Sequence, residues 1–294
     1  AAIELGCFSR AGISITLEHI FPVDKCLEGL RSGKWEFVVG TAHALPQVFP
    51  GYRGAKFLST VGRHTYWFLV MHSDLNVARG DLNALQGSVI GAAPMVEQGL
   101  RGIFSEAGID IAEARIDIGP VPGAARPGVS FGVQAAKALE AGAIDGFWAN
   151  GLGTALAVER GIGTVVIDAR RGDGPRATRT FTFAALMTSD AVIEGDPHAA
   201  AACMRAISDA QTKLKRNPVR ATDIARAWFP ETEAELAERV VTRDLPYYVS
   251  AIHENDIRSL NAFVEKFGFD ESNSTFDDAV APQNLREIWN EAMA

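Results

Sequence analysis

The sequence alternates short apolar runs with amphipathic stretches, and most of these amphipathic stretches end in glycine. Glycine is the usual residue just past the C-terminus of a helix, so each unit reads as helix, glycine, strand. A chain built from such units is typical of an α/β fold with mainly parallel sheets. The predicted strands are 13–20, 35–41, 55–62, 65–72, 87–93, 114–119, 146–150, 164–169 and 180–189.

One eight-residue pattern occurs twice. GCFSRAGI at 6–13 is matched at six of eight positions by GIFSEAGI at 102–109. Each copy is predicted to end a helix at its second glycine and then to enter a strand region. Cys7 takes the place of Ile103, so we expect Cys7 to pack as an apolar side chain rather than to act as a nucleophile.

A second repeated segment follows the first in the same order. LRSGKWEFVVGT at 30–41 is matched by LEAGAIDGFWAN at 139–150. Both consist of a helix end, a glycine, an acidic residue, an apolar strand and a closing polar residue, which is Thr41 in one copy and Asn150 in the other. The two repeats together predict two similar α/β lobes.

The two copies differ in length and in where they begin. The spacing of the repeats predicts an insertion in the second copy, at 120–132. In the second copy the octet follows the strand and loop GSVIGAAPM, at 87–95. We therefore expect the equivalent strand of the first copy to lie before Ala1.

The bulk composition excludes several classes of protein. The formal net charge is −8 and lysine and arginine form no cluster, which excludes a nucleic-acid or anionic-membrane surface. No apolar run approaches the roughly 18 residues that span a bilayer. Three cysteines cannot form a complete disulfide framework. From 196 onward the pattern is mostly helical, and these helices are expected to cover one lobe.

In open parallel sheets, ligands bind outside the carboxyl ends of the strands. Thr41 and Asn150 are the strongest candidates because each is a polar residue at the same strand end of its lobe. Arg63 or Arg126 offers a charge-assisted contact to an anion, although an ion-paired or solvated role fits as well. Tyr66, Trp67 and Trp148 fit either stacking on a ligand ring or core packing. The candidates from strand ends and from the inserted loop are Thr41, Ala42, His43, Arg63, His64, Thr65, Pro94, Met95, Arg126, Ser130, Asn150 and Gly151.

The motifs of catalysis are not matched. PGVSFG contains a literal G-x-S-x-G around Ser130, but a nucleophile elbow needs a strand directly before the serine, and GAARP stands there. GLGTAL at 151–156 lacks the third glycine of a dinucleotide-binding fingerprint. The histidines and cysteines show no metal-ligand spacing. The sequence therefore predicts no catalytic residue, no metal and no cofactor.

Several strings together resemble the solute-binding proteins of ABC transporters, in particular the group for alkanesulfonates, taurine, nitrate and thiamine precursors. LEGLRSGKWEFVVGTAHAL is similar to the group's first-lobe helix and strand, and DLNALQGSVIGAAPMVEQGLRGIFSEAGID to the start of its second lobe. AAKALEAGAIDGFWANG and SDAVIEGDPHAAAACMRAISDAQTKLKRNP resemble its later segments. The resemblance covers most of the chain and rests on the order and spacing of these pieces.

This resemblance implies a two-lobed type II periplasmic-binding-protein fold with two crossing hinge strands and a helical C-terminal region packed on lobe one. Lobe one would comprise 1–65 and 182–294, and lobe two would comprise 66–181. The crossings would place His64 and Arg179 at the cleft between the lobes. The family also implies a periplasmic or lipid-anchored location, an ABC permease as partner and a monomeric state.

The function implied is a receptor that clamps a small anionic organic ligand, a sulfonate or a carboxylate with or without a ring, by hinge closure. One alternative is an enzyme on the same fold, of the pyrimidine-synthase, desulfinase or menaquinone-pathway type, with His43 or His64 as a base. A third class is a ligand-sensing regulatory domain, although the sequence contains no helix-turn-helix pattern for DNA.

Overall fold

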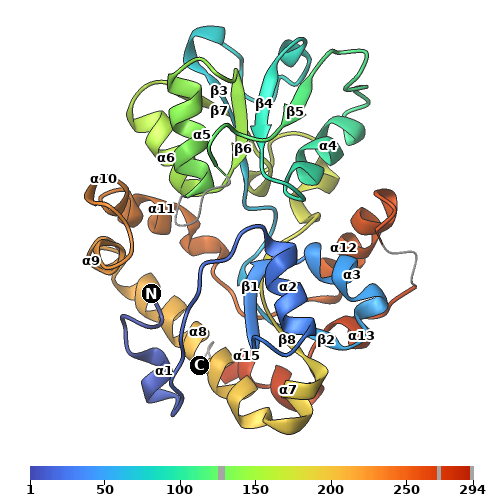
Figure 1. The fold of residues 1–294 in the computed structure, drawn as a ribbon, viewed down its shortest axis with the longest axis vertical. Helices are drawn as coiled ribbons and strands as arrows, with labels where there is room; N and C mark the ends of the chain where they lie inside the picture. Colours follow the sequence, from blue (N-terminus) through green and yellow to red (C-terminus); the bar gives the residue numbers. More distant parts are fainter. Residues whose placement is uncertain (125–129, 270–272, 292–294) are drawn as a thin grey trace. The chain divides into compact units, whose positions relative to one another are not determined.

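The computed structural model describes residues 1–124, 130–269 and 273–291. The chain divides into two compact units, each with its own sheet (Figure 1). Unit 1 contains Ala1–His64 and Thr182–Ala294, and unit 2 contains Thr65–Phe181. The chain therefore passes from one unit to the other twice, between His64 and Thr65 and between Phe181 and Thr182.

Unit 2 holds a five-stranded sheet with the order β5-β4-β6-β3-β7. Three of its helices follow strands directly along the chain, as the alternating pattern predicts. The strands are β3 (Phe68–His72), β4 (Val89–Ala92), β5 (Asp117–Gly119), β6 (Gly146–Ala149) and β7 (Gly163–Asp168), and the helices are α4 (Glu97–Glu106), α5 (Phe131–Glu140) and α6 (Gly151–Glu159).

Unit 1 holds a three-stranded sheet with the order β1-β8-β2. Its strands are β1 (Phe37–Thr41), β2 (Ala55–Gly62) and β8 (Ala184–Ser189). Its helices before the first crossing are α1 (Cys7–Arg10), α2 (Val23–Arg31) and α3 (Ala44–Val48). After β8 the unit is helical, with α7 (Asp190–Gly195), α8 (Pro197–Arg216), α9 (Arg220–Arg226), α10 (Glu231–Ala234), α11 (Ala237–Asp244), α12 (Glu254–Lys266), α13 (Phe276–Ala279), α14 (Gln283–Arg286) and α15 (Ile288–Glu291).

The expectation of mainly parallel sheets is wrong. In unit 1, β8 pairs antiparallel with both β1 and β2. In unit 2, β4 is parallel to β5 and β6, but β3 is antiparallel to β6 and β7. The antiparallel strands are β3 in unit 2 and β8 in unit 1. Each is the first strand after the chain crosses between the units, and it runs opposite to its neighbours in the sheet.

The predicted strand at 13–20 is also wrong, because this segment has no regular structure. Its side chains alternate in exposure only up to 16, and Leu17 is 49% exposed. A strand needs a hydrogen-bonded neighbour, and the described part of unit 1 pairs β1 only with β8. The other predicted strands form, with ends that shift by up to four residues.

Both sequence repeats are confirmed as repeats of structure. At the end of α1, Gly12 has a φ of 81° and Ile13 donates its N–H to the carbonyl of Phe8. At the end of α4, Gly108 has a φ of 72° and Ile109 donates to Phe104 in the same way. A positive φ is the conformation that glycine adopts at little cost, which is why each helix ends there.

The second repeat shows the same agreement. Gly33 after α2 and Gly142 after α5 have φ values of 73° and 68°. Each repeat then runs through a turn into a strand, β1 in unit 1 and β6 in unit 2. Thr41 therefore ends β1 in the way that Asn150 follows β6.

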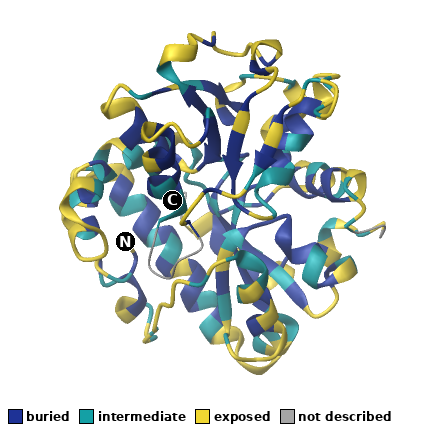
Figure 2. Cartoon of the chain, turned by 45° about the horizontal axis from the view of Figure 1, so that its top comes forward, coloured by how far each residue is buried: buried dark blue, intermediate teal, exposed yellow. Residues whose placement is uncertain are grey.

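Most residues of the strands are buried. Figure 2 shows the strands of both sheets mainly in the colour of buried residues, with exposed residues on loops and on the outer faces of helices. In unit 2 the core joins side chains of β3, β4, β6 and β7 to those of α4. Its largest members are Trp67, Phe104 and Trp148.

Candidate functional site

The carboxyl ends of three strands meet at one edge of the unit 2 sheet. β4 and β6 are parallel, and β3 is antiparallel to both β6 and β7, so β4, β6 and β7 share one direction. Phe68, at the start of β3, lies opposite Ala149 on one side and Asp168 on the other. The residues just past Ala149 and Asp168, and those just before Phe68, therefore lie at the same edge.

Asn150 occupies this edge with its side chain exposed. The amide makes no hydrogen bond, ion pair or ring contact among the described residues. Asn150 precedes the first turn of α6, where the backbone N–H groups have no partner within the helix. The amide and these N–H groups form a set of donors suited to an anion.

Arg179 lies at the same edge of unit 2. The N–H of Thr65 donates to the carbonyl of Arg179 at 3.0 Å, and the Thr65 hydroxyl donates to the carbonyl of Thr178 at 2.7 Å. Thr65 is three residues before Phe68, which places it near the start of β3. The Arg179 side chain is exposed and has no ion-pair partner in the parts of the chain that the structure describes. A free cation and a free amide thus share one edge of the sheet.

The remaining predicted residues of unit 2 lie in the loops around this edge. Pro94 is exposed and follows β4, and Met95 has a φ of 67°, a region in which non-glycine residues are uncommon. Gly151 is the first residue of α6 and is buried. Ser130 precedes α5, and Arg126 lies outside the described residues.

In unit 1, Thr41 and His43 are brought together with a third side chain, Thr182. The Thr41 Oγ1 lies 2.9 Å from His43 Nδ1 and 3.0 Å from Thr182 Oγ1, and Nδ1 lies 3.1 Å from Thr182 Oγ1. All three side chains are buried. We call this group the hydroxyl–imidazole triad.

The other predicted residues of unit 1 have structural partners. Ala42 is buried and donates its N–H to the carbonyl of Phe183 at 2.9 Å. Arg63 pairs with Asp256, a buried carboxylate of α12, at 3.3 Å. His64, at the crossing, has a φ of 65° and lies 6.0 Å from the Tyr247 ring. The Arg63 cation is therefore committed to Asp256 rather than left free for an anion.

The aromatic residues considered for ring stacking belong mainly to the core. Trp67 is 4% exposed and Trp148 is 0% exposed, and their rings lie 6.1 Å apart. Trp148 also donates its indole N–H to the carbonyl of Val96. Tyr66 is half-buried and packs beside Trp67 at 4.6 Å. Of the three, only Tyr66 retains exposed surface for a ligand.

Three polar residues at these strand ends are not among the predicted site residues. Thr182 falls within the predicted strand 180–189, and its contact with Thr41 depends on the pairing of β1 with β8. Asp168 is the last residue of β7 and Arg170 follows it, and they are 3% and 2% exposed. Ligands bind outside the carboxyl ends of strands, and applying this principle to β7 would have identified Asp168 and Arg170, because both stand at its carboxyl end.

The glycines of the two unmatched motifs have a packing role. Gly132, from PGVSFG, and Gly153, from GLGTAL, bring α5 and α6 into contact. A Cβ on Gly153 would lie 2.2 Å from the carbonyl oxygen of Gly132. Ser130, the serine of PGVSFG, directly precedes α5, and the residues before it that an elbow would need as a strand lie outside the described residues.

The three cysteines have the features of packed side chains. Cys7 is 1% exposed, like Ile103 at 0%, which occupies the same place in the repeat. Burial raises the pKa of the Cys7 thiol, and the nearby Asp209 raises it further. Burial also raises the pKa of Cys26, and it raises that of Cys203 to about 12.

We expect the native thiols to react slowly with a disulfide reagent at about pH 8, because the thiolate is the reactive form and a raised pKa reduces its fraction. Half-buried Cys26 should react first. Unfolding in denaturant should release all three thiols, which Ellman's reagent counts. A fast native reaction that disappears in Cys7→Ala would contradict the assignment of Cys7 to packing.

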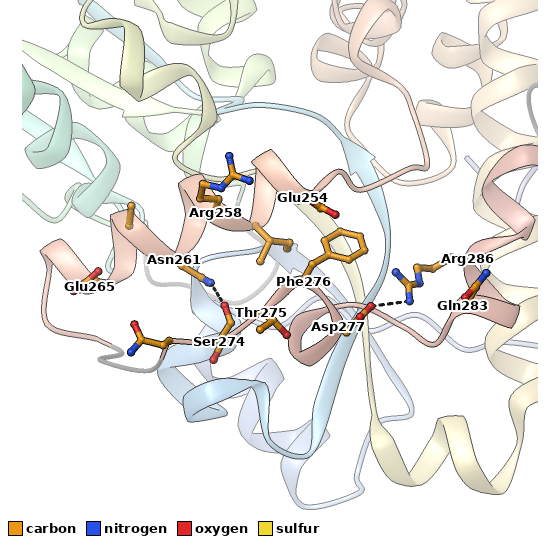
Figure 3. Close-up of a pocket in the computed structure, with 13 residues that line it drawn as sticks. Glu254, Arg258, Asn261, Glu265, Ser274, Thr275, Phe276, Asp277, Gln283 and Arg286 are labelled. Carbon is orange, nitrogen blue, oxygen red and sulfur yellow. Dashed lines mark hydrogen bonds and ion pairs between the residues drawn. The ribbon is translucent and has the colours of Figure 1, made fainter.

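A separate groove of about 820 Å³ lies in unit 1, lined by residues of α12, α13, α14 and the loop before α13 (Figure 3). Asn261 donates to the carbonyl of Ser274 at 2.8 Å, and Arg286 pairs with Asp277 at 2.8 Å. The groove contains charges of both signs, and it contains none of the predicted binding residues.

The described residues contain no metal-binding cluster and no helix long and apolar enough to span a membrane. No cluster of three or more histidine, cysteine, aspartate or glutamate side chains is placed to hold a metal ion. Within the same residues, every helix is too short or too polar to cross a membrane.

The sequence matches no protein-family model, and it matches no curated protein. Solved structures are similar in fold. The periplasmic nitrate-binding protein NrtA from Synechocystis PCC 6803 superposes with a TM-score of 0.73 at 14% identity, over 99% of this chain and 83% of that one. The alkanesulfonate-binding protein SsuA from Xanthomonas axonopodis pv. citri, bound to MOPS, gives 0.68 at 15% identity, over 91% and 88%.

A third similar structure is a mutant of DszB in complex with biphenyl-2-sulfinic acid. Its TM-score is 0.66 at 13% identity, over 99% of this chain and 94% of that one. These identities show a shared fold and nothing more specific. The chain therefore has the two-lobed type II fold of the ABC-type periplasmic solute-binding proteins.

Proposed function

We propose that this protein is an extracytoplasmic solute-binding receptor of an ABC importer and that it binds a small anionic organic ligand with residues of both units. The ligand is a sulfonate or a carboxylate, with or without an aromatic ring. The partner is an ABC permease, the location is periplasmic or lipid-anchored, and the receptor acts as a monomer.

The observation that carries this proposal is the pair Asn150 and Arg179 at one edge of the unit 2 sheet. Neither side chain has a partner within the described residues, and both are exposed. An arginine without a carboxylate beside it is suited to a sulfonate or carboxylate group, which it can contact with two parallel hydrogen bonds. The first turn of α6, next to Asn150, adds backbone N–H donors and the partial positive charge of a helix N-terminus.

The similar structures support the same class of ligand. One is a nitrate-binding protein and another an alkanesulfonate-binding protein. Nitrate and sulfonates are small anions, which agrees with the donor set at the unit 2 edge. In unit 1, the Thr41 hydroxyl stands at the equivalent strand end and supplies a further polar group.

A thermal-shift panel tests the proposal. We expect the melting temperature to rise with at least one of methanesulfonate, benzenesulfonate, acetate, benzoate and nitrate. A ligand at 100 times its dissociation constant adds about 2.7 kcal/mol to the free energy of unfolding. Sodium chloride at the same ionic strength is the control for general salt effects. If no anion raises the melting temperature above that control, the proposed ligand class is wrong.

The alternative function is an enzyme on the same fold. The similarity to DszB, whose mutant was solved with biphenyl-2-sulfinic acid, favours this alternative. A cysteine nucleophile has little support, because the pKa values of all three thiols are raised. A histidine base remains as His43 or His64. Incubation with biphenyl-2-sulfinic acid and with the panel anions, followed by chromatography, separates the two functions: a receptor leaves them unchanged, and an enzyme consumes one of them.

A further inference from the structure

Two arginines lie on the same side of a short 3₁₀ helix of unit 2, η5 (Arg176–Thr180). A 3₁₀ helix has about three residues per turn, so the side chains of residues i and i+3 lie one above the other. The burial pattern follows this register, because Thr178 is fully buried whereas Arg176 and Arg179 are both exposed. The two arginines therefore form one row, with Cα atoms about 6 Å apart along the helix axis at about 2 Å per residue.

Hydrogen bonds hold η5 at the edge of the unit 2 sheet where Asn150 lies. Thr65, just before β3, donates its N–H to the carbonyl of Arg179 at 3.0 Å and its hydroxyl to the carbonyl of Thr178 at 2.7 Å. The Thr178 hydroxyl in turn donates to the carbonyl of Pro175, the residue before the helix, at 2.6 Å. The backbone that carries both arginines is thus held at each end of the helix.

The carboxylates in the segment just before η5 are paired with other cations. Asp173 accepts hydrogen bonds from Nε of Arg79 on both of its oxygens, each at 2.9 Å. Asp168, at the end of β7, pairs with Arg171 at 3.2 Å. These two carboxylates therefore neutralise Arg79 and Arg171 rather than the arginines of η5.

Arg176 and Arg179 have no hydrogen bond or ion pair from their side chains in the part of the chain that the structure describes. On α4, which packs against η5, Glu97 lies 3.9 Å from Arg101. Two neighbouring like charges repel each other, and a ligand with one anionic group compensates only one of them. A ligand with two anionic groups can contact both guanidinium groups, each through two parallel hydrogen bonds.

We infer that the ligand of this protein is a dianion, with two anionic groups such as a sulfonate and a carboxylate joined by a short linker. Arg179, together with Asn150, holds the first group, and Arg176 selects for the second. The inference rests on the proposed function and narrows it, from any small organic anion to one with two charged groups. Arg176 is therefore a specificity-determining residue, which the predicted site did not include.

Titration calorimetry with matched pairs of anions at pH 7.5 and constant ionic strength tests the inference. The pairs are acetate with succinate, methanesulfonate with sulfoacetate, and benzenesulfonate with 3-sulfobenzoate. We expect the dianion of at least one pair to bind about tenfold more tightly than its monoanion, or better. Equal affinities within every pair that binds would overturn the inference and leave the proposed function standing. If no member of any pair binds, both are wrong.

Arg176→Gln tests the residue assigned to the second group. Glutamine keeps a polar side chain but has no charge, so the favoured dianion should bind no better than its monoanion. Arg176→Lys keeps the charge without the paired donors and should show an intermediate preference. A preference for the dianion that survives unchanged in Arg176→Gln would overturn the role of Arg176. Thermal melts identify any variant that fails to fold, and the comparison of pairs on the wild-type protein needs no variant.

Arg115→Gln is the matched control. Arg115 is also an exposed arginine of unit 2 without an ion pair among the described residues. It precedes β5, which is parallel to β4, so it lies at the edge of the sheet opposite to the carboxyl ends. Its removal changes the net charge by the same amount and should leave the preference for the dianion intact. An equal loss in both variants would assign the preference to net charge and overturn the role of Arg176.

Discussion

Gly153→Ala is expected to lower the free energy of unfolding by about 1–3 kcal/mol, although alanine is the better helix former. The new Cβ would lie 2.2 Å from the carbonyl oxygen of Gly132 and 2.6 Å from its Cα. These are backbone atoms, so no rotation of a side chain relieves the clash, and α5 and α6 must move apart. α5 packs against β6 and α6 against β7 and β3, and a separation of the two helices would reduce the contacts that hold Asn150, which precedes α6, in place.

Denaturant unfolding monitored by circular dichroism measures this change. Gly195→Ala, at the end of α7, is the matched control because a Cβ there would meet no atom within 4 Å. The control should be neutral or stabilising by up to about 1 kcal/mol. Equal stability of Gly153→Ala and the wild-type protein would show that α5 and α6 are not in the contact described.

Asn150→Ala is expected to weaken the binding of a panel anion by about tenfold to a hundredfold, which corresponds to the loss of one or two hydrogen bonds to a charged group. The protein should remain equally stable, because the amide has no partner in the described part of the chain and caps no backbone group of α6. Isothermal titration calorimetry with the anion that gives the largest thermal shift measures the affinity.

Asn83→Ala provides the comparison. Asn83 is also an exposed asparagine of unit 2, and it precedes β4, so it lies toward the opposite edge of the sheet from Asn150. Its removal should leave the affinity unchanged. If Asn150→Ala also binds the anion as the wild-type protein does, the unit 2 edge is not the binding site.

The local elements could be predicted because their signals are local. Gly12 and Gly108 end helices through a positive φ that a glycine adopts readily, and the apolar runs after the glycines of the second repeat become β1 and β6. The repeats therefore predicted that Thr41 and Asn150 stand at equivalent strand ends of the two units. The packing role of Cys7 followed in the same way, from its alignment with Ile103.

Pairings between distant segments could not be predicted in the same way. The direction of β3 and β8 depends on where the crossings enter each sheet, and nothing within either strand encodes it. The segment 13–20 has a strand-like composition but no neighbour among the described residues, so it stays irregular. Arg63 looked like a free cation until α12 placed Asp256 beside it.

The sequence by itself determined the α/β class, the helix ends and the polar residues at the strand ends, because propensity and spacing act over a few residues. Only the tertiary structure decided which of those residues have free hydrogen-bonding groups. Among the described residues, Asn150 and Arg179 have no side-chain partner, whereas Arg63 is paired with Asp256. Thr41 contacts His43 and also Thr182, which lies far along the chain. The physical reason is that hydrogen bonds and ion pairs depend on distances between atoms, and the folding of the whole chain sets those distances.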